Sequence, residues 1–360
     1  MDTMERSIFV LALLLGMLVV CLQASRVAGE TYSVNDHQIE VGLIPEKSTI
    51  MLAEPIYLAF VVRNHSEQDL QVLVGGDYRN ALGRPESFTV AVTRMDGKPV
   101  TQPSAGPSMG GMFGPKRIPA KGEHTFKLFL PHWATFEEPG DYSIRVRRTL
   151  QLSRHTPGRW DMQEKITDVQ VQAGAEIKVL PQDRKEMGRI IAQLGDTMLG
   201  KRPDEAEPAA RSLSYIHDER VIPYFVKAFE TNEYNKKSTA IQALSKFNNE
   251  QAFQAIKKAL DTKGADIGNA TTAEVADQSA RNIRHTAAAA LARSPHPQSL
   301  PLLLSLRNNP SEAIRITVLH AVGKMKPEQA IPILQEMTQD ESQLVSDEAK
   351  RYLGLHSSQK

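Results

Sequence analysis

The feature that most constrains the fold is a helix-opening segment that recurs four times in the second half of the chain. Each copy follows a short polar break and starts an apolar pattern with three- and four-residue spacing, which indicates an amphipathic helix. The aligned positions are Val221, Ala252, Leu300 and Ala330, which are 31, 48 and 30 residues apart. Such a period predicts stacked helical hairpins. The long interval holds one repeat plus an insertion at residues 263–278, which we expect to be a loop or, alternatively, a gate on one face.

Two motifs within these repeats resemble the first helix of HEAT repeats, in the bacterial subfamily with short helices. In that family an apolar residue and an arginine precede alanine-rich positions, and Ile283-Arg284 and Ile314-Arg315 match this pattern. Small residues let the helices of a hairpin approach, and larger ones seal the groove to the next hairpin. The helix at Ser238–Leu244 has the small apolar face but lacks the arginine. The resemblance implies a HEAT-type α-solenoid over residues 182–360.

Residues 30–181 carry a different pattern, in which short runs of apolar and β-branched residues are separated by turn residues. Such runs at regular spacing predict an antiparallel β-sandwich. The expected strands are Gln38–Leu43, Pro55–Arg63, Leu70–Val74, Phe88–Thr93, Phe126–Phe129, Tyr142–Val146 and Ile166–Val171. Asp96-Gly97 predicts a hairpin between two strands, because both residues tolerate a positive φ angle.

Two of these segments resemble strands of bacterial immunoglobulin-like domains. Residues 54–64 look like the early core strand, and residues 138–146 look like the late strand that a Pro-Gly turn and a tyrosine introduce. The resemblance implies that the Tyr142 hydroxyl bonds back to the preceding loop and pins a corner of the sandwich. We therefore predict a multidomain all-β plus all-α chain: an Ig-like antiparallel β-sandwich followed by the HEAT-type solenoid.

The first 29 residues are typical of a signal peptide. An apolar run at Ile8–Leu22 is followed by the small residues Val27-Ala28-Gly29, which predicts cleavage before Glu30. The run is shorter than the roughly 20 residues of a bilayer span. Acidic residues near the start leave an uncleaved N-terminal anchor as the alternative. We expect an exported protein, either periplasmic or extracellular.

Charge and cysteine usage narrow the function. The formal net charge is +1, which argues against general nucleic-acid binding and against a polybasic membrane-surface module. Cys21 is the single cysteine and falls within the signal segment, after Val20 instead of the small residue that a lipobox needs. The mature chain therefore has no thiol for a disulfide, a nucleophile or a zinc site. Arg145 and Arg147 share one face of a strand, which is typical of a solvated face and, alternatively, of a ligand patch.

The motifs for catalysis are incomplete. Residues 106–110 match the G-x-S-x-G pattern around Ser108, but no helical pattern follows them, as a nucleophile elbow requires. No two of the ten histidines have the i, i+4 spacing that places two metal ligands on one helix face. We predict that the chain is not an enzyme and binds no metal or cofactor.

Three surfaces are candidates for binding a partner. The first is a glycine-rich loop with Met109, Met112 and Phe113, which forms a recognition tip or, alternatively, folds back onto the protein. The second is a long hairpin through Leu150–Trp160 that turns at residues 156–158; it carries interface-prone side chains or, alternatively, is a plain structural hairpin or a contact between the domains. The third is the wall formed by the second helix of each repeat. The candidates on the second and third surfaces are Arg154, Arg159, Trp160, Tyr224, Lys227, Lys257, Lys258 and Arg307.

The function that these features favour is non-catalytic binding. We predict a protein–protein or protein–polymer interaction scaffold of the bacterial envelope or extracellular space, whose partner the sequence does not identify. The alternative is an inhibitor or regulator of an extracytoplasmic protease or other enzyme. In that case Met112 and Phe113 would act as the inserted wedge.

Overall fold

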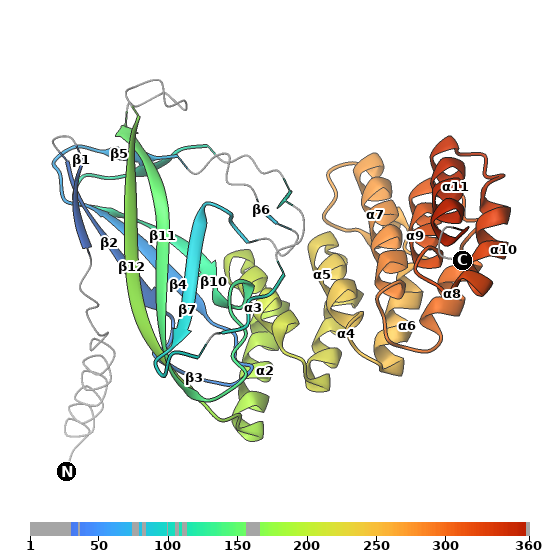
Figure 1. The fold of residues 1–360 in the computed structure, drawn as a ribbon, viewed down its shortest axis with the longest axis horizontal. Coiled ribbons are helices and arrows are strands. Elements are labelled where there is room, and N and C mark those ends of the chain that lie inside the picture. Colours follow the sequence, from blue (N-terminus) through green and yellow to red (C-terminus); the bar gives the residue numbers. More distant parts are fainter. Residues whose placement is uncertain are drawn as a thin grey trace, which may run out of the picture. The chain divides into compact units, whose positions relative to one another are not determined.

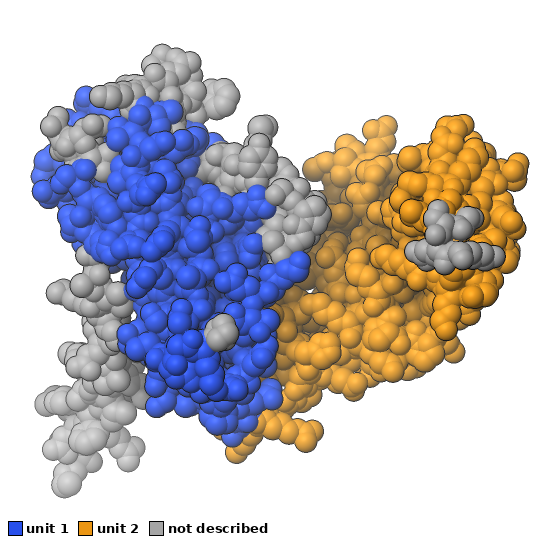
Figure 2. Space-filling model, viewed as in Figure 1, with its two compact units in different colours: residues 1–183 blue, residues 184–360 orange. Residues whose placement is uncertain are grey.

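The computed structural model describes residues 30–34, 37–73, 79–80, 84–98, 100–104, 108–109, 114–155 and 166–357. The chain divides into two compact units, residues 1–183 and residues 184–360, which Figure 2 draws in different colours. The first unit is built from strands and the second from helices (Figure 1). The predicted fold class, an all-β domain followed by an all-α domain, is confirmed.

The strands of the first unit form two facing sheets. The four-stranded sheet has the order β1 (Glu30–Val34), β2 (His37–Pro45), β4 (Tyr57–Asn64) and β10 (Glu123–Phe129). The six-stranded sheet has the order β3 (Thr49–Met51), β12 (Thr167–Leu180), β11 (Gly140–Arg154), β5 (Leu70–Val72) and β9 (Lys116–Ile118), and β7 (Phe88–Arg94) also pairs with β11. A separate ladder joins β6 (Arg79–Asn80) to β8 (Ser108–Met109). The sheets are antiparallel except where β3 runs parallel to β12.

The core lies between the two sheets, and the alternation along β11 decides which of its residues enter it. Ile144 and Val146 are fully buried on the inner face. Arg148 also lies on that face, with its guanidinium carbon 4.5 Å from the centre of the Phe88 ring and 4.6 Å from that of Phe126. Stacking between two rings lets a charged side chain enter an apolar core. The residues between these positions on β11 project outward into solvent.

The tyrosine corner is confirmed. The Tyr142 hydroxyl donates a hydrogen bond to the carbonyl oxygen of Glu138 at 2.6 Å, and the ring packs edge-on against Phe136 at 4.8 Å between centroids. Burial raises the pKa of Tyr142, so the hydroxyl keeps its proton for this bond. The bond joins the start of β11 to the loop before it.

The prediction of a β-hairpin at Asp96-Gly97 is wrong. Gly97 does adopt a positive φ of 81°, so the turn forms after β7. The segment that follows makes only an isolated bridge between Thr101 and Thr135 among the described residues. Prolines at positions 99, 103 and 107 explain the difference, because they lack the N–H groups that a second strand would contribute to a ladder.

The second unit is a stack of helical hairpins. Its helices are α2 (Arg184–Leu199), α3 (Pro203–Tyr215), α4 (Ile222–Glu230), α5 (Tyr234–Leu244), α6 (Glu250–Ala259), α7 (Ala273–Leu291), α8 (Ser299–Ser305), α9 (Glu312–Val322), α10 (Pro327–Met337) and α11 (Gln343–Ser357). Consecutive helices pack in pairs, from α2 with α3 to α10 with α11. Helices α5, α7, α9 and α11 stack in one layer, and α2, α4 and α6 stack in the other (Figure 1).

The insertion at residues 263–278 is more structured than predicted. A 3-10 turn, η3 (Gly264–Asp266), packs against α7, and the Gly268 N–H donates to the carbonyl of Asn232 at 2.8 Å. The expected loop is wrong for residues 273–278, which form the first turns of α7. The Thr272 hydroxyl caps that helix by accepting a hydrogen bond from the Val275 N–H at 3.2 Å.

In four helices of this unit, a side chain at an equivalent position donates a hydrogen bond to a backbone carbonyl of the segment that precedes the helix. Arg284 donates to the Thr262 carbonyl at 2.6 Å, and Arg315 donates to the Asn309 carbonyl at 2.8 Å. The equivalent positions in α5 and α11 carry other donors, with Lys237 bonding Phe229 O at 2.8 Å and Ser346 bonding Thr338 O at 2.7 Å. Burial lowers the pKa of Lys237. The helix that lacked the family arginine thus has a lysine in the same role.

Within the described ranges, no helix is both long enough and apolar enough to cross a bilayer.

Candidate binding surfaces

The described residues form neither a metal-binding cluster nor the elements of a nucleophile elbow. That part of the chain contains no group of three or more His, Cys, Asp and Glu side chains able to hold a metal ion. Ser108 of the G-x-S-x-G match lies in β8, and the next described element after it is the strand β9. The strand–turn–helix context of a nucleophile elbow is therefore not formed by these elements.

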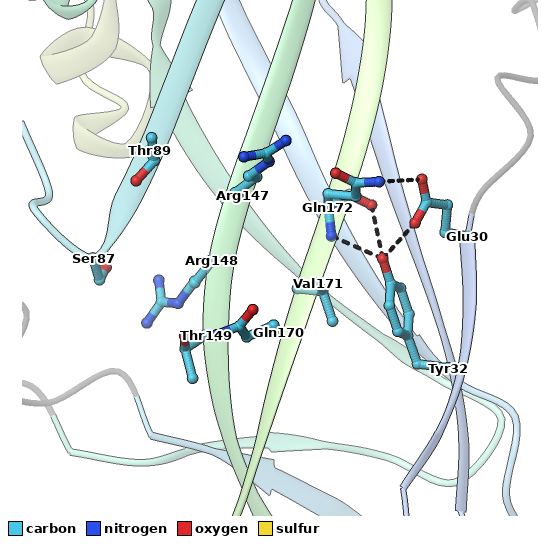
Figure 3. A pocket seen from close by; sticks show the side chains of 10 residues that line it. All are labelled: Glu30, Tyr32, Ser87, Thr89, Arg147, Arg148, Thr149, Gln170, Val171 and Gln172. Carbon is cyan, nitrogen blue, oxygen red and sulfur yellow. Dashed lines mark hydrogen bonds between the residues drawn. The ribbon is translucent and has the colours of Figure 1, made fainter.

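The outer surface of the six-stranded sheet carries a pair of arginines, and we call this surface the arginine face. Its residues come from β7, β11 and β12, which lie in front of β2 and β4 in Figure 1. They are Thr89, Ala91, Thr93, Ser143, Arg145, Arg147, Thr149, Gln170, Gln172, Gly174 and Glu176. The strand register places Arg145 between Ala91 and Gly174. Arg147 lies between Thr89 and Gln172, as Figure 3 shows.

Neither arginine is engaged by the protein. Both side chains are exposed, and within the described residues neither makes an ion pair or a side-chain hydrogen bond. Arg94, at the end of the neighbouring strand, is different, because it pairs with Glu138 and with Asp96. An exposed guanidinium without a partner keeps its full capacity for a planar, two-point contact with an anion.

Three shallow depressions lie along the arginine face. Their volumes are about 460, 340 and 770 Å³, and Arg147 lines the first while Arg145 lines the second. Tyr32 closes the edge of the first depression: its hydroxyl accepts from the Gln172 N–H at 2.9 Å and lies 2.6 Å from a Glu30 carboxylate oxygen (Figure 3). Burial, together with the hydrogen bond to Glu30, raises the pKa of Tyr32. The hydrogen bond from Tyr32 holds the Glu30 carboxylate at the edge of the first depression.

On the helical unit, the predicted wall residues separate into two groups. Lys227, Lys257 and Lys258 are exposed in the last turns of α4 and α6, without an ion pair in the described structure. We call these three the lysine edge. Their position near the C-terminal carbonyls of two helices also has a structural benefit, because cations there interact favourably with the helix dipole.

Tyr224 and Arg307 are engaged within the protein. Tyr224 is half-buried, and its ring packs so closely on Gly195 of α2 that a Cβ at Gly195 would lie 2.2 Å from it. Arg307 forms an ion pair with Glu336 at 3.0 Å. These two side chains therefore connect neighbouring hairpins.

A groove between α3 and α5 was missed by sequence reasoning. It has a volume of about 470 Å³ and includes Met198, Ala206 and Ala210, with Glu207 and Arg211 paired on its rim. Helix α5 stacks on α7 more closely than α3 stacks on α5, and this opens the groove. No local sequence signal encodes such a spacing between helices.

Several predicted binding residues lie outside the described residues. They are Met112, Phe113, Arg159 and Trp160, together with the side chain of Met109, whose backbone belongs to β8. Arg154 is exposed at the end of β11. The recognition loop and the tip of the β11–β12 hairpin remain predictions.

Comparison with known proteins bears mainly on the helical unit. Residues 269–354 match the family model of HEAT repeats, which spans α7 to most of α11. This match confirms HEAT-type repeats in the C-terminal unit. No curated protein matches the chain significantly.

Among solved structures, the chain is similar to the CARDB domain of a Pyrococcus furiosus protein, with 9% identity, 42% of this chain and 100% of that chain covered, and a TM-score of 0.20. It is similar to human deoxyhypusine hydroxylase, with 13% identity, coverage of 48% and 87%, and a TM-score of 0.22. It is also similar to the complex of CpcE and CpcF of phycocyanin lyase from Nostoc sp., with 17% identity, coverage of 47% and 81%, and a TM-score of 0.22.

Proposed function

We propose that this chain is a non-catalytic scaffold of the bacterial envelope or extracellular space, and that its helical unit binds a protein partner. HEAT repeats favour this function, because stacked hairpins build extended surfaces that suit protein partners. The observation that carries the proposal is the lysine edge, in which three exposed lysines on neighbouring helices have no acidic partner of their own among the described residues.

The lysine edge favours an acidic segment as the bound element. Equivalent helices of successive hairpins in a solenoid run in the same direction, and α4 and α6 stack in one layer, so their last turns lie at the same border of the unit. Each exposed ion pair would contribute about 0.2–1 kcal/mol, so the three lysines act together rather than singly. The contribution weakens with added salt, because exposed charges are screened.

Charge reversal at the lysine edge tests the proposal. The full chain is immobilised, partners from an envelope extract are captured, and a captured protein is purified and measured again by titration. A triple variant, Lys227→Glu, Lys257→Glu and Lys258→Glu, should weaken that binding by at least about tenfold. The matched control changes three other exposed lysines of the same unit, Lys185→Glu, Lys324→Glu and Lys326→Glu. Equal loss in the control, or no loss in the first variant, would contradict the proposal.

Export is tested separately. The apolar run at Ile8–Leu22 supports a cleaved signal segment, and expression in a bacterial host followed by fractionation measures where the protein accumulates. N-terminal sequencing of the mature protein should begin at Glu30. Retention in the cytoplasm with Met1 intact would refute the envelope assignment.

A further inference from the structure

We propose that the arginine face of the sandwich binds a linear acidic polysaccharide, a sugar chain that carries carboxylates. This inference goes beyond the proposed function, which concerns the helical unit and a protein partner. It begins from charge complementarity. Arg145 and Arg147 lie two residues apart on one side of β11, about 7 Å from each other along the strand. Two unpaired guanidinium groups at this spacing suit successive carboxylates of a chain lying along the strand.

The second observation that supports this proposal is the glycine at position 174. It lies inside β12, directly beside Arg145, where glycine weakens a strand because it has no side chain to pack. The fold does not require glycine there: a Cβ at this position would have its nearest contact at 3.5 Å, from the Ile144 carbonyl oxygen. On the other side of Arg145 stands the small residue Ala91. The two small neighbours leave both flanks of the guanidinium accessible to a ligand.

The rest of the face distinguishes a sugar chain from a peptide. Around the two arginines the exposed side chains are short hydroxyls and amides, among them Thr89, Thr149 and Gln170, which can exchange hydrogen bonds with a polyol. The exposed carboxylates Asp141 and Glu176 lie beyond Arg145, at the third depression. Protein interfaces are anchored by buried aromatic and large apolar side chains. Among the described residues that line the depressions, the exposed large apolar side chain is that of Met95, which follows β7 and borders two of the depressions at one end.

The shape of the face suits a chain bound lengthwise. From Ser143 to Thr149 the outward side of β11 runs for about 20 Å at the usual rise per residue. The two depressions that Arg147 and Arg145 line follow this strand and its neighbours and are shallow, so several sugar units can lie across them. The third depression is lined by Asp141 and Glu176 and lies outside the proposed site.

The experiment measures binding of the full chain to polygalacturonate by calorimetry or affinity electrophoresis. Neutral dextran and poly-L-glutamate serve as comparison polymers. The wild type should bind polygalacturonate in a salt-sensitive way and should not bind dextran. The variant Arg145→Gln/Arg147→Gln should bind at least about tenfold more weakly. The control Lys116→Gln/Lys127→Gln removes the same charge from exposed positions on β9 and β10 and should bind like the wild type.

Two further variants separate recognition from general attraction. Arg145→Lys/Arg147→Lys keeps the charge but loses the planar fork, so binding should still fall several-fold. Gly174→Val keeps the charge and suits a strand, and it should weaken binding by covering one flank of Arg145. Equal losses in the lysine control, unchanged binding in Gly174→Val, or tighter binding of poly-L-glutamate than of polygalacturonate would each overturn the proposal. The last outcome would assign the face to an acidic peptide.

Discussion

At the residue scale, Arg315 shows how a buried charge is held in the helical unit. Its guanidinium donates to both carboxylate oxygens of Asp340, at 2.8 and 2.9 Å, and to the carbonyls of Asn309 and Pro310. The side chains of the ion pair are 6% and 9% exposed. Burial raises the pKa of Asp340, but the hydrogen bonds from Arg315 and from the Ser342 N–H outweigh it, so the pKa lies below its ordinary value.

The Arg315→Ala substitution should destabilise the helical unit by about 3 kcal/mol, because it leaves the carboxylate of Asp340 buried without its cation. Urea denaturation followed by the helical circular-dichroism signal measures the change. Arg307→Ala is the matched control, since its partner Glu336 is exposed and its loss should cost less than about 1 kcal/mol. Similar effects of the two substitutions would show that the pair with Asp340 is no stronger than a surface ion pair.

The same ion pair predicts how stability depends on pH. A carboxyl group whose pKa is lowered by folding stabilises the protein above its unfolded pKa, near 4, and loses that contribution as the pH falls through the folded pKa. The helical unit should therefore lose stability below about pH 4. Asp340→Asn should be less stable at neutral pH and show a flatter acid dependence in the same denaturation series. Parallel acid profiles for the two proteins would refute this origin.

At the element scale, the fit of α4 against α2 depends on a glycine. The ring of Tyr224 occupies the space that a side chain at Gly195 would need. A Cβ at Gly188, in the same helix, would meet only the end of the Arg220 side chain, whose nearest nitrogen also donates to the Arg184 carbonyl. A side chain at Gly195 would therefore meet a rigid aromatic ring, whereas one at Gly188 would meet the end of a long side chain.

Replacing these two glycines with alanine should change the stability of the unit by different amounts. Gly195→Ala should destabilise the unit by about 1–3 kcal/mol, because the rigid ring of Tyr224 has to move. Gly188→Ala should be neutral or stabilising by up to about 1 kcal/mol, because alanine favours a helix. Thermal denaturation of both variants measures the difference. Combining Gly195→Ala with Tyr224→Ala should cost less than the sum of the single changes, and simple additivity would rule out the proposed contact.

At the scale of the whole molecule, the two units have separate cores and should unfold in separate steps. Both tryptophans of the chain, at positions 133 and 160, belong to the first unit, and Trp133 is buried in its core. Tryptophan fluorescence therefore follows the sandwich, and the helical circular-dichroism signal follows the solenoid. Arg315→Ala should shift only the helical transition in urea. A shift of both signals together would mean that the units unfold as one.

Local patterns in the sequence were sufficient for the fold class and for the tyrosine corner. Helical spacing, strand alternation and the turn before Tyr142 depend on residues near each other in the chain, and these features appear in the structure. The Asp96-Gly97 hairpin failed because a good turn does not ensure a partner strand. The extension of β12 beyond Val171 was also missed, because pairing with β11 carries the strand beyond its apolar run.

What the tertiary structure alone decided is the surroundings of each surface residue. The sequence placed Arg145 and Arg147 on one side of a strand, but their neighbours Ala91 and Gly174 come from other strands through cross-strand register. The same is true of the half-buried Tyr224, which was predicted to project and instead packs on Gly195. Periodicity along a chain determines which residues share a face, whereas contacts between elements distant in sequence determine what lies beside them.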